Sequence, residues 1–281
     1  MSLVNIAYSA ALTWSNPSLK KLEDQALVPM FGDHPVELGM KKEGKFVSLI
    51  RKDPTYQGLF PAAFPGGADP FTIENVTKAI ACFERTIISA RSPYDRYHCD
   101  GDYNAVPAAA KHGEALLFSE SCACFHCHGG YNFSDATMSA RTAGRPVEFH
   151  NNGLYNLHGP LSYPADNLGI YEHTKVTSDV GKFKAPTLRN IGVTGPYMHD
   201  GSIVSLGEVI DHYAAGGREI STGPNAGIGR NNPNKDPRIG GFKMTPQDRV
   251  NLIVFLETLT DRELLYDKRF SNPWIGQNRA P

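Results

Sequence analysis

Residues 124–128, Cys-Phe-His-Cys-His, are the segment whose residue types and spacing define a chemistry most sharply. In the pattern C-x-x-C-H, two thiols one helical turn apart can add across the two vinyl groups of a porphyrin, and the next histidine lies beneath the iron. The pattern therefore predicts a covalently attached haem c, with Cys124 and Cys127 as attachment points and His128 as the proximal ligand.

Three other interpretations of this motif are weaker. A structural zinc site usually has four ligands in two pairs, and Cys82, Cys99 and Cys122 form no second C-x-x-C pair. A thioredoxin-like redox pair follows a β-strand, whereas the pattern before Cys124 is helical. A chance cluster of buried thiols would leave His128 and the two glycines after it without a function.

The other cysteines carry less information. Cys82 falls on an expected core helix, where a free cysteine usually serves as a small buried hydrophobic side chain. In an oxidising compartment, Cys99 and Cys122 could form a disulfide. The spacing leaves open whether they are paired or free.

Helical periodicity dominates the sequence. From residue 72 to 90, apolar side chains recur at intervals of three and four, which predicts a buried stripe on a long core helix. The stripe consists of Ile73, Val76, Ile80, Phe83 and Ile87. A capping threonine, a proline at the first helical position and an acid in the first turn predict another helix from residue 245 to about 260.

The remaining pattern indicates a mainly α fold. Further helices are expected over 18–27, 42–51, 108–119 and 206–214. Segments 143–182 and 216–241 have no sustained period but hold many aromatic residues and histidines, so we expect ordered, functional loops there. A Gly- and Asp-rich stretch within 99–106 predicts a boundary between a domain over 1–105 and a domain over 106–281.

The composition excludes several classes of partner. The formal net charge is −1 and there is no run of like charges, so nothing favours a nucleic acid backbone. No stretch approaches the roughly 18 apolar residues that a membrane span needs. The N-terminus lacks a basic segment followed by an apolar one, so no secretory signal is visible.

Two blocks of the chain resemble a known family. Residues 185–202, from Ala-Pro-Thr-Leu-Arg-Asn to His-Asp-Gly-Ser, are similar to the C-terminal signature of the bacterial di-haem cytochrome c peroxidase and MauG family. The second block, which resembles the segment between the family's two haem motifs, contains Asn5 to Tyr8, Trp14, 22–26, Pro29 and His34 to Gly39. The resemblance is closest to the MbnH-type members. It implies two cytochrome c-like helical lobes with long ordered loops, the first lobe incomplete in this chain.

By this resemblance, Cys124, Cys127 and His128 attach the second of the family's haems. The family takes the sixth ligand of that haem fourteen residues beyond the His-Asp-Gly histidine, which is Tyr213 here. The peroxidases have methionine there, and the MauG and MbnH types have tyrosine. Because a phenolate is a hard anionic donor that stabilises ferric iron, Tyr213 predicts a haem that stores oxidising equivalents. From the residue alone, Tyr213 would be a half-buried aromatic near a helix end.

The resemblance also assigns residues around the first haem. Glu37 matches the distal carboxylate, which moves a proton from one peroxide oxygen to the other, and Pro29 lines the same pocket. Trp14 matches the tryptophan between the two haems, an oxidisable ring suited to passing electrons. From the residues alone, Glu37 would be a solvated charge and Trp14 part of the core packing.

Calcium is the second cofactor that the resemblance implies. The carbonyl oxygens of Thr194 and Pro196 match two ligands of the family's inter-domain calcium ion, and calcium prefers hard oxygen ligands such as backbone carbonyls. His199 lies in the same block. We expect it to have a structural role or to contact a haem propionate, rather than to be catalytic.

The chain departs from the family in one respect. The family has two C-x-x-C-H motifs, and this sequence has one. We therefore expect the chain to begin inside the complete protein, downstream of an export signal, the first haem motif and a third calcium ligand. Because haem c attachment and disulfides belong to the periplasmic side, a periplasmic location is expected.

Three functions are compatible with the sequence. By resemblance, the leading hypothesis is a peroxide-dependent di-haem oxidase whose Tyr213-ligated haem oxidises a tryptophan on a periplasmic, copper-associated partner protein. The second is a hydrogen peroxide-reducing cytochrome c peroxidase with a small redox protein as electron donor. The third is a single-haem electron-transfer module, if the chain is complete as written.

Overall fold

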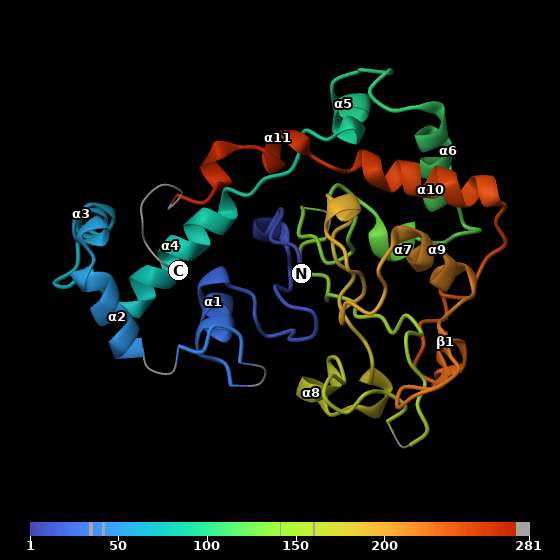
Figure 1. Ribbon diagram of the computed structural model, residues 1–281, viewed down its shortest axis with the longest axis horizontal. Helices are drawn as coiled ribbons and strands as arrows, with labels where there is room; N and C mark the ends of the chain where they lie inside the picture. The colour runs from blue at the N-terminus through green and yellow to red at the C-terminus, as the bar shows by residue number, and fades with distance from the viewer. Residues whose placement is uncertain (34–35, 41–42, 141, 160, 274–281) are drawn as a thin grey trace.

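The computed structural model shows a mainly helical chain, which confirms the predicted fold class. It describes residues 1–33, 36–40, 43–140, 142–159 and 161–273. His34 and Pro35 of the second family-like block lie outside these ranges. Two groups of helices lie side by side, α1 to α4 in one and α5 to α10 in the other (Figure 1). Within the described ranges, no helix is long and apolar enough to cross a membrane.

The first group contains one 3-10 turn and four helices. These are η1 (Ile6–Tyr8), α1 (Leu22–Phe31), α2 (Glu43–Lys52), α3 (Pro54–Ala63) and α4 (Ile73–Arg85). Buried Met30, Phe60 and Val76 join α1, α3 and α4 in one apolar cluster. Helix α1 begins four residues later than predicted, because residues before it form a loop closed by a hydrogen bond from the Leu12 amide to the Leu19 carbonyl (3.2 Å).

Helix α4 differs from the prediction in its length and in the face that it buries. It ends at Arg85 rather than near residue 90. Ala81 is fully buried inside the first group of helices, so the side chains of residues 82 and 83 point outward. Cys82 is exposed and Phe83 is 51% exposed, so the prediction that both are buried is wrong. Phe83 instead packs its ring against Phe270, with ring centroids 5.8 Å apart.

The second group contains six helices and a small hairpin. The helices are α5 (Pro93–Cys99), α6 (Ala108–Leu117), α7 (Phe125–His128), α8 (Tyr171–Thr174), α9 (Leu206–Ala214) and α10 (Pro246–Thr258). The 3-10 turns are η2 (Thr177–Asp179), η3 (Ile191–Val193) and η4 (Gly229–Asn231). Strands β1 (Glu219–Ile220) and β2 (Gly227–Ile228) pair antiparallel, with Glu219 opposite Ile228. Helices α6, α9 and α10 lie within about two residues of their predicted bounds.

Helices α6 and α10 cross closely at Gly113 and form the core of this group. A Cβ atom at Gly113 would lie 2.6 Å from the carbonyl carbon of Asn251 and 2.8 Å from the Cβ of Phe255. Only glycine permits this approach. The cluster around the crossing includes Leu117, Phe133 and Leu252, all nearly fully buried.

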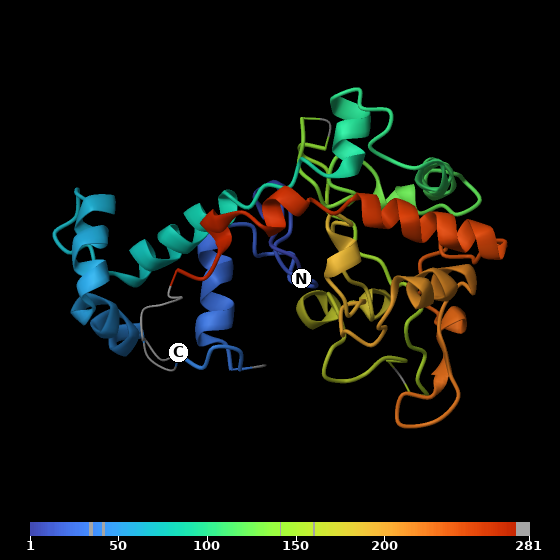
Figure 2. The same cartoon turned by 45° about the horizontal axis from the view of Figure 1, so that its top comes forward.

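The segment after α10 runs back to the first group (Figures 1 and 2). It contains α11 (Arg262–Leu265) and η5 (Lys268–Phe270). The buried carboxylate of Asp261 accepts hydrogen bonds from the amides of Ala90 and Arg91, both at 3.0 Å. These hydrogen bonds therefore hold the residues that follow α4 against the segment that follows α10.

Buried asparagines hold the long loops in place. The described parts of 143–182 and 216–241 are largely irregular, as predicted. The Asn151 side chain donates to the Val180 carbonyl (3.1 Å), and the Asn232 side chain donates to the Tyr155 carbonyl (2.8 Å). These bonds satisfy buried backbone carbonyls that a regular sheet would otherwise pair.

Candidate haem site

The C-x-x-C-H residues form the short helix α7. The His128 amide donates to the Cys124 carbonyl at 2.8 Å, so one helical turn separates the two thiols, as the predicted attachment requires. Cys124 and Cys127 both line a cavity of about 330 Å³. The other three cysteines are free as well, so the structure does not contain the disulfide between Cys99 and Cys122 that the sequence left open.

The His128 ring is oriented by a backbone carbonyl. Its Nδ1 lies 3.1 Å from the Phe133 carbonyl oxygen, and because a carbonyl only accepts, Nδ1 carries the hydrogen. Nε2 then keeps its lone pair for a metal. Burial lowers the pKa of His128, against the opposing effect of the Phe133 carbonyl, so the ring stays in the neutral form that binds iron. Gly130, with φ +70°, provides the turn that returns Phe133 to the ring.

Arg189 supports the loop between α7 and Phe133. Its guanidinium is 1% exposed and donates to both carboxylate oxygens of Asp95 at 2.9 Å. It also donates from Nε and Nη2 to the Tyr131 carbonyl, at 3.0 and 2.8 Å. Arg189 therefore links helix α5, which carries Asp95, to the loop that positions His128.

Helix α9 brings Tyr213 to the same cavity. The helix begins with a capping box, in which the Ser205 hydroxyl accepts from the Glu208 amide at 3.2 Å. Burial raises the pKa of Tyr213 to about 12, and a hydrogen bond from the Asn152 side chain opposes that rise. The structure thus brings Tyr213 to the same cavity as Cys124, Cys127 and His128 of the distant C-x-x-C-H motif, as predicted.

His150 lies at the centre of a buried ionic network that sequence reasoning missed. Its Nδ1 is 2.7 Å from the Asp236 carboxylate, and its Nε2 is 2.6 Å from the Asp135 carboxylate. Burial acts to lower the pKa of His150, but hydrogen bonds with Asp135 and Cys127 raise it to about 10. Two carboxylates within hydrogen-bond distance thus favour the protonated form of the ring, beside the haem motif. The only sequence signal was the abundance of histidines in the loop over 143–182.

Trp14 lines the same cavity, on the irregular segment before α1. Lys184 fixes that segment, because its amide donates to the Trp14 carbonyl (2.8 Å) and its ammonium donates to the Ala11 carbonyl (2.8 Å) and the Ser9 hydroxyl (3.2 Å). Lys184 is 5% exposed, and burial lowers its pKa to about 8. Sequence reasoning did not single out Lys184.

Glu37 and Pro29 lie apart from this cavity. Among the residues that the structure describes, neither is part of its lining. Glu37 is exposed on the loop after α1. The amide of the next residue, Leu38, donates to the Pro29 carbonyl at 2.9 Å. The backbone therefore brings Glu37 and Pro29 into the same region, in the α1 to α4 group.

The two carbonyls assigned to calcium lie on an exposed segment between η3 and α9. Thr194 and Pro196 are exposed, and no hydrogen bond between described residues ends on either carbonyl oxygen. These oxygens are free to bind a cation or water. Nearby His199 lines the haem-motif cavity, where its ring stacks on Phe183 with centroids 3.7 Å apart. Burial lowers the pKa of His199 to about 4.

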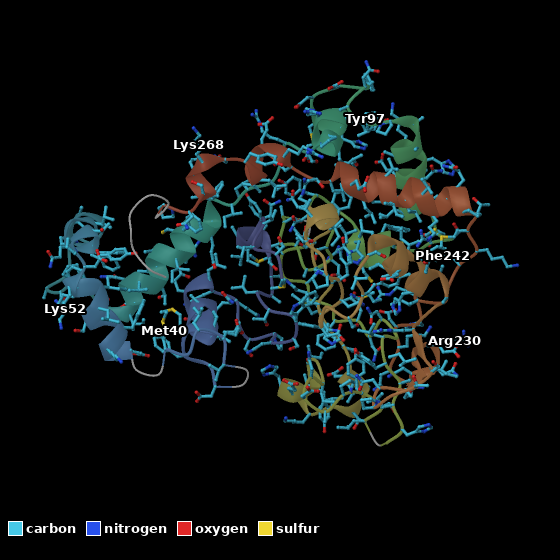
Figure 3. The ribbon with its side chains drawn as sticks, in the orientation of Figure 1. Met40, Lys52, Tyr97, Arg230, Phe242 and Lys268 are labelled. Carbon is cyan, nitrogen blue, oxygen red and sulfur yellow. The ribbon has the colours of Figure 1, made fainter. Side chains whose placement is uncertain are left out.

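The cavity suits a haem in its donors, its walls and its charge. Two thiols and an imidazole lie on the α7 side, and the phenol of Tyr213 lies on the α9 side. Apolar residues complete the walls, among them Phe242 on the segment before α10 (Figure 3). The cationic side chains of Lys184 and Arg238 also line it, and they match the anionic propionates of a haem.

Comparison with known proteins agrees with this assignment. Residues 1–104 match the family described as di-haem cytochrome c peroxidase. The chain is 32% identical over 281 residues to cytochrome-c peroxidase IdrP1 of Pseudomonas sp. strain SCT, covering 95% of this chain and 69% of that protein. The chain belongs to the di-haem cytochrome c peroxidase and MauG family. Membership in this di-haem family implies haem c as the cofactor.

Two further similar proteins support the same family assignment. The methylamine utilization protein MauG of Methylorubrum extorquens is 33% identical over 260 residues, which cover 92% of this chain and 63% of MauG. A solved structure of a MauG-like protein associated with microbial copper homeostasis is 41% identical, with a TM-score of 0.92 over 97% of this chain and 78% of that one. This chain spans 63% and 66% of the length of the two MauG proteins that it matches.

Proposed function

We propose that Cys124, Cys127 and His128 hold one covalent haem c and that Tyr213 supplies the sixth ligand of its iron. The observation that carries this proposal is that α7 and α9 present a neutral imidazole and a phenol to one cavity. The haem, when attached, would supply the redox chemistry of its iron. The protein contributes position, charge and the exclusion of water.

Tyr213 would bind as a phenolate. Burial raises the pKa of its hydroxyl to about 12, so the free side chain keeps its proton at neutral pH. A cation in the cavity favours the charged form and removes that proton. A phenolate oxygen is a harder donor than a thioether, and it stabilises the ferric state.

We further propose that Trp14 passes electrons between this cavity and the α1 to α4 group. Its indole lines the cavity while its segment leads directly into α1. In that group, Glu37 would take a proton from one oxygen of hydrogen peroxide and return it to the other, and Pro29 would shape the same pocket. Thr194 and Pro196 would offer carbonyl oxygens to a calcium ion.

For the complete protein we propose a peroxide-dependent oxidoreductase that oxidises an aromatic residue, tryptophan, on a periplasmic partner protein. Its support is the tyrosine at position 213 and the likeness to MauG and to a MauG-like protein associated with copper homeostasis. The second candidate is reduction of hydrogen peroxide with electrons from a small redox protein. Its support is the 32% identity to a cytochrome-c peroxidase. A single-haem electron-transfer module is the third candidate, supported by the one C-x-x-C-H motif in this sequence.

Replacing Tyr213 tests the ligation directly. The chain is produced in a bacterial periplasm with the cytochrome c maturation system, and its absorption spectrum and reduction potential are measured. We expect the wild type to lack the methionine-to-iron charge-transfer band and Tyr213→Met to gain it, with a higher potential. Tyr197→Phe is the matched control, because Tyr197 lines the same cavity and donates its hydroxyl to the Ile191 carbonyl (3.1 Å). Identical spectra for wild type and Tyr213→Phe would contradict the ligation.

The candidate activities are separated by their products in the complete protein. It is given hydrogen peroxide, first with a reduced small cytochrome and then with a tryptophan-bearing partner protein. Oxygen added to a partner tryptophan, found by peptide mass spectrometry, supports the leading proposal. Stoichiometric oxidation of the cytochrome with an unmodified partner supports the peroxidase, and no reaction with peroxide would leave the electron-transfer module.

A further inference from the structure

The hydroxyl of Tyr155 donates a short hydrogen bond to a carboxylate. Its oxygen lies 2.6 Å from Oδ2 of Asp200, which is the usual length for an O–H donor and a charged acceptor. Tyr155 is 7% exposed. Asp200 is exposed, and its other oxygen accepts from the Ser202 amide at 2.9 Å. A buried phenol is thus paired with a proton acceptor on an exposed residue.

A row of aromatic rings connects Tyr155 with the haem-motif cavity. The Tyr155 ring packs edge-to-face on the ring of Tyr163, with centroids 5.4 Å apart. The centroid of Tyr163 lies 6.1 Å from that of Phe183 and 6.0 Å from that of His199. Phe183 and His199 line the cavity, and Trp14 packs against the cluster that contains both tyrosines. Neighbouring rings therefore give an electron a route between Tyr155 and the cavity wall.

The surrounding backbone fixes both tyrosines. The Asn232 side chain donates to the Tyr155 carbonyl at 2.8 Å. At Gly181, which has φ +74°, an added Cβ atom would lie 2.6 Å from two carbons of the Tyr163 ring. Only glycine fits beneath that ring in this conformation. The two rings are therefore held at their separation by the packing around them.

The hydrogen bond to Asp200 distinguishes Tyr155 from the tyrosines nearer the cavity. Loss of an electron makes a phenol strongly acidic, so the oxidation needs a base beside the hydroxyl. The Tyr163 hydroxyl is buried and has no partner among the described residues. The Tyr197 hydroxyl donates to the Ile191 carbonyl at 3.1 Å, and a backbone carbonyl does not take up a proton at neutral pH. The carboxylate of Asp200 is a base, and it already accepts the hydrogen of Tyr155.

We propose that Tyr155 is a redox site of the protein that holds one oxidising equivalent close to the surface. One electron leaves the Tyr155 ring for the haem that hydrogen peroxide has oxidised. The phenolic O–H bond breaks, its proton passes to Oδ2 of Asp200, and a neutral tyrosyl radical remains. One electron from an external one-electron donor reverses both transfers. This inference rests on the proposed reaction of the haem with hydrogen peroxide.

Electron paramagnetic resonance of the complete holoprotein, frozen at set times after hydrogen peroxide is added, tests this site. Ring-deuterated tyrosine narrows the signal if the radical is a tyrosyl. We expect Tyr155→Phe to abolish the tyrosyl signal. Asp200→Asn keeps an acceptor oxygen but takes up no proton, so the signal should form about a hundredfold more slowly, the lower end of what a general base contributes.

Tyr197→Phe is the matched control, because Tyr197 lines the cavity itself but donates to a carbonyl. It should leave the signal unchanged. Each variant is checked for full haem content by the pyridine haemochrome assay and for its fold by far-UV circular dichroism, so that a lost signal reports on the tyrosine and not on a missing haem.

The haem absorption spectrum of the same samples separates this inference from the function on which it rests. If hydrogen peroxide oxidises the haem but no tyrosyl signal forms, or if Tyr155→Phe leaves the signal intact, the role of Tyr155 is refuted and the peroxide reaction stands. A signal that forms equally fast in Asp200→Asn refutes the proton transfer on which the site depends. If peroxide leaves the haem spectrum unchanged, the proposed function fails and the inference falls with it.

Discussion

Replacing Asp95 by asparagine should destabilise the helices that hold the haem motif. The Asp95 carboxylate is nearly buried and accepts two hydrogen bonds of 2.9 Å from the Arg189 guanidinium, which is 1% exposed. An asparagine of the same size removes the negative charge and leaves the guanidinium buried without a counter-ion. Breaking a buried ion pair by removing one partner costs about 3–5 kcal/mol. Because asparagine keeps one acceptor, we expect about 3 kcal/mol, the lower end of that range.

The same pair predicts how stability depends on pH. Burial acts to raise the pKa of Asp95, but hydrogen bonds with Arg189 and Ser92 lower it below the usual value. A carboxylate whose folded pKa lies below its unfolded pKa stabilises the fold above about pH 4 and loses that contribution as the pH falls through the folded pKa. The wild type should therefore lose stability more steeply than Asp95→Asn as the pH falls below about 4.

Urea unfolding of the haem-loaded chain, followed by far-UV circular dichroism, measures both effects. Glu74→Gln is the matched control, because the Glu74–Lys78 pair on α4 is an exposed ion pair of 2.6 Å, and such pairs contribute little. A midpoint for Asp95→Asn that equals that of Glu74→Gln would refute the argument.

Two further predictions concern packing. Gly113→Ala should destabilise the fold by about 1–3 kcal/mol, because the added Cβ meets the Asn251 backbone across the α6 and α10 crossing; urea unfolding measures this, and an unchanged midpoint would contradict the close approach. Lys184→Met should loosen the segment that carries Trp14, because it loses the charged hydrogen bond to the Ala11 carbonyl. Such bonds contribute about 1.5–3 kcal/mol, so hydrogen exchange over residues 9–14 should quicken about tenfold or more by mass spectrometry, and unchanged exchange would refute it.

The sequence predicted the features of this molecule that depend on neighbouring residues. The attachment motif lies within one helical turn, so haem attachment could be predicted without knowing the fold. Helix α9 begins with a capping box and α10 with a capped proline, and local signals of this kind set helix bounds. The same signal was available for α5, where Ser92 and Asp95 form a capping box around Pro93, although that helix is short and was not predicted.

Features that depend on distant residues could not be predicted. His150 binds Asp236, 86 positions away in the sequence, and no local pattern pairs them. The outward face of α4 was assigned wrongly, because the ring contact of Phe83 with Phe270, far along the sequence, leaves no local pattern. The expectation that Tyr213 shares a site with His128 came from the family resemblance, since periodicity gives the helix but not what its last turn faces.

Covalent attachment of haem to residues 124–128 is the central claim, and the intact mass of the purified chain tests it most directly. The chain is produced with the cytochrome c maturation system, denatured to remove any non-covalent haem, and weighed by mass spectrometry. The account predicts a red protein whose mass is increased by one haem, and a Cys124→Ala, Cys127→Ala variant with the mass of the polypeptide alone. A colourless wild-type chain with the unmodified polypeptide mass would contradict it.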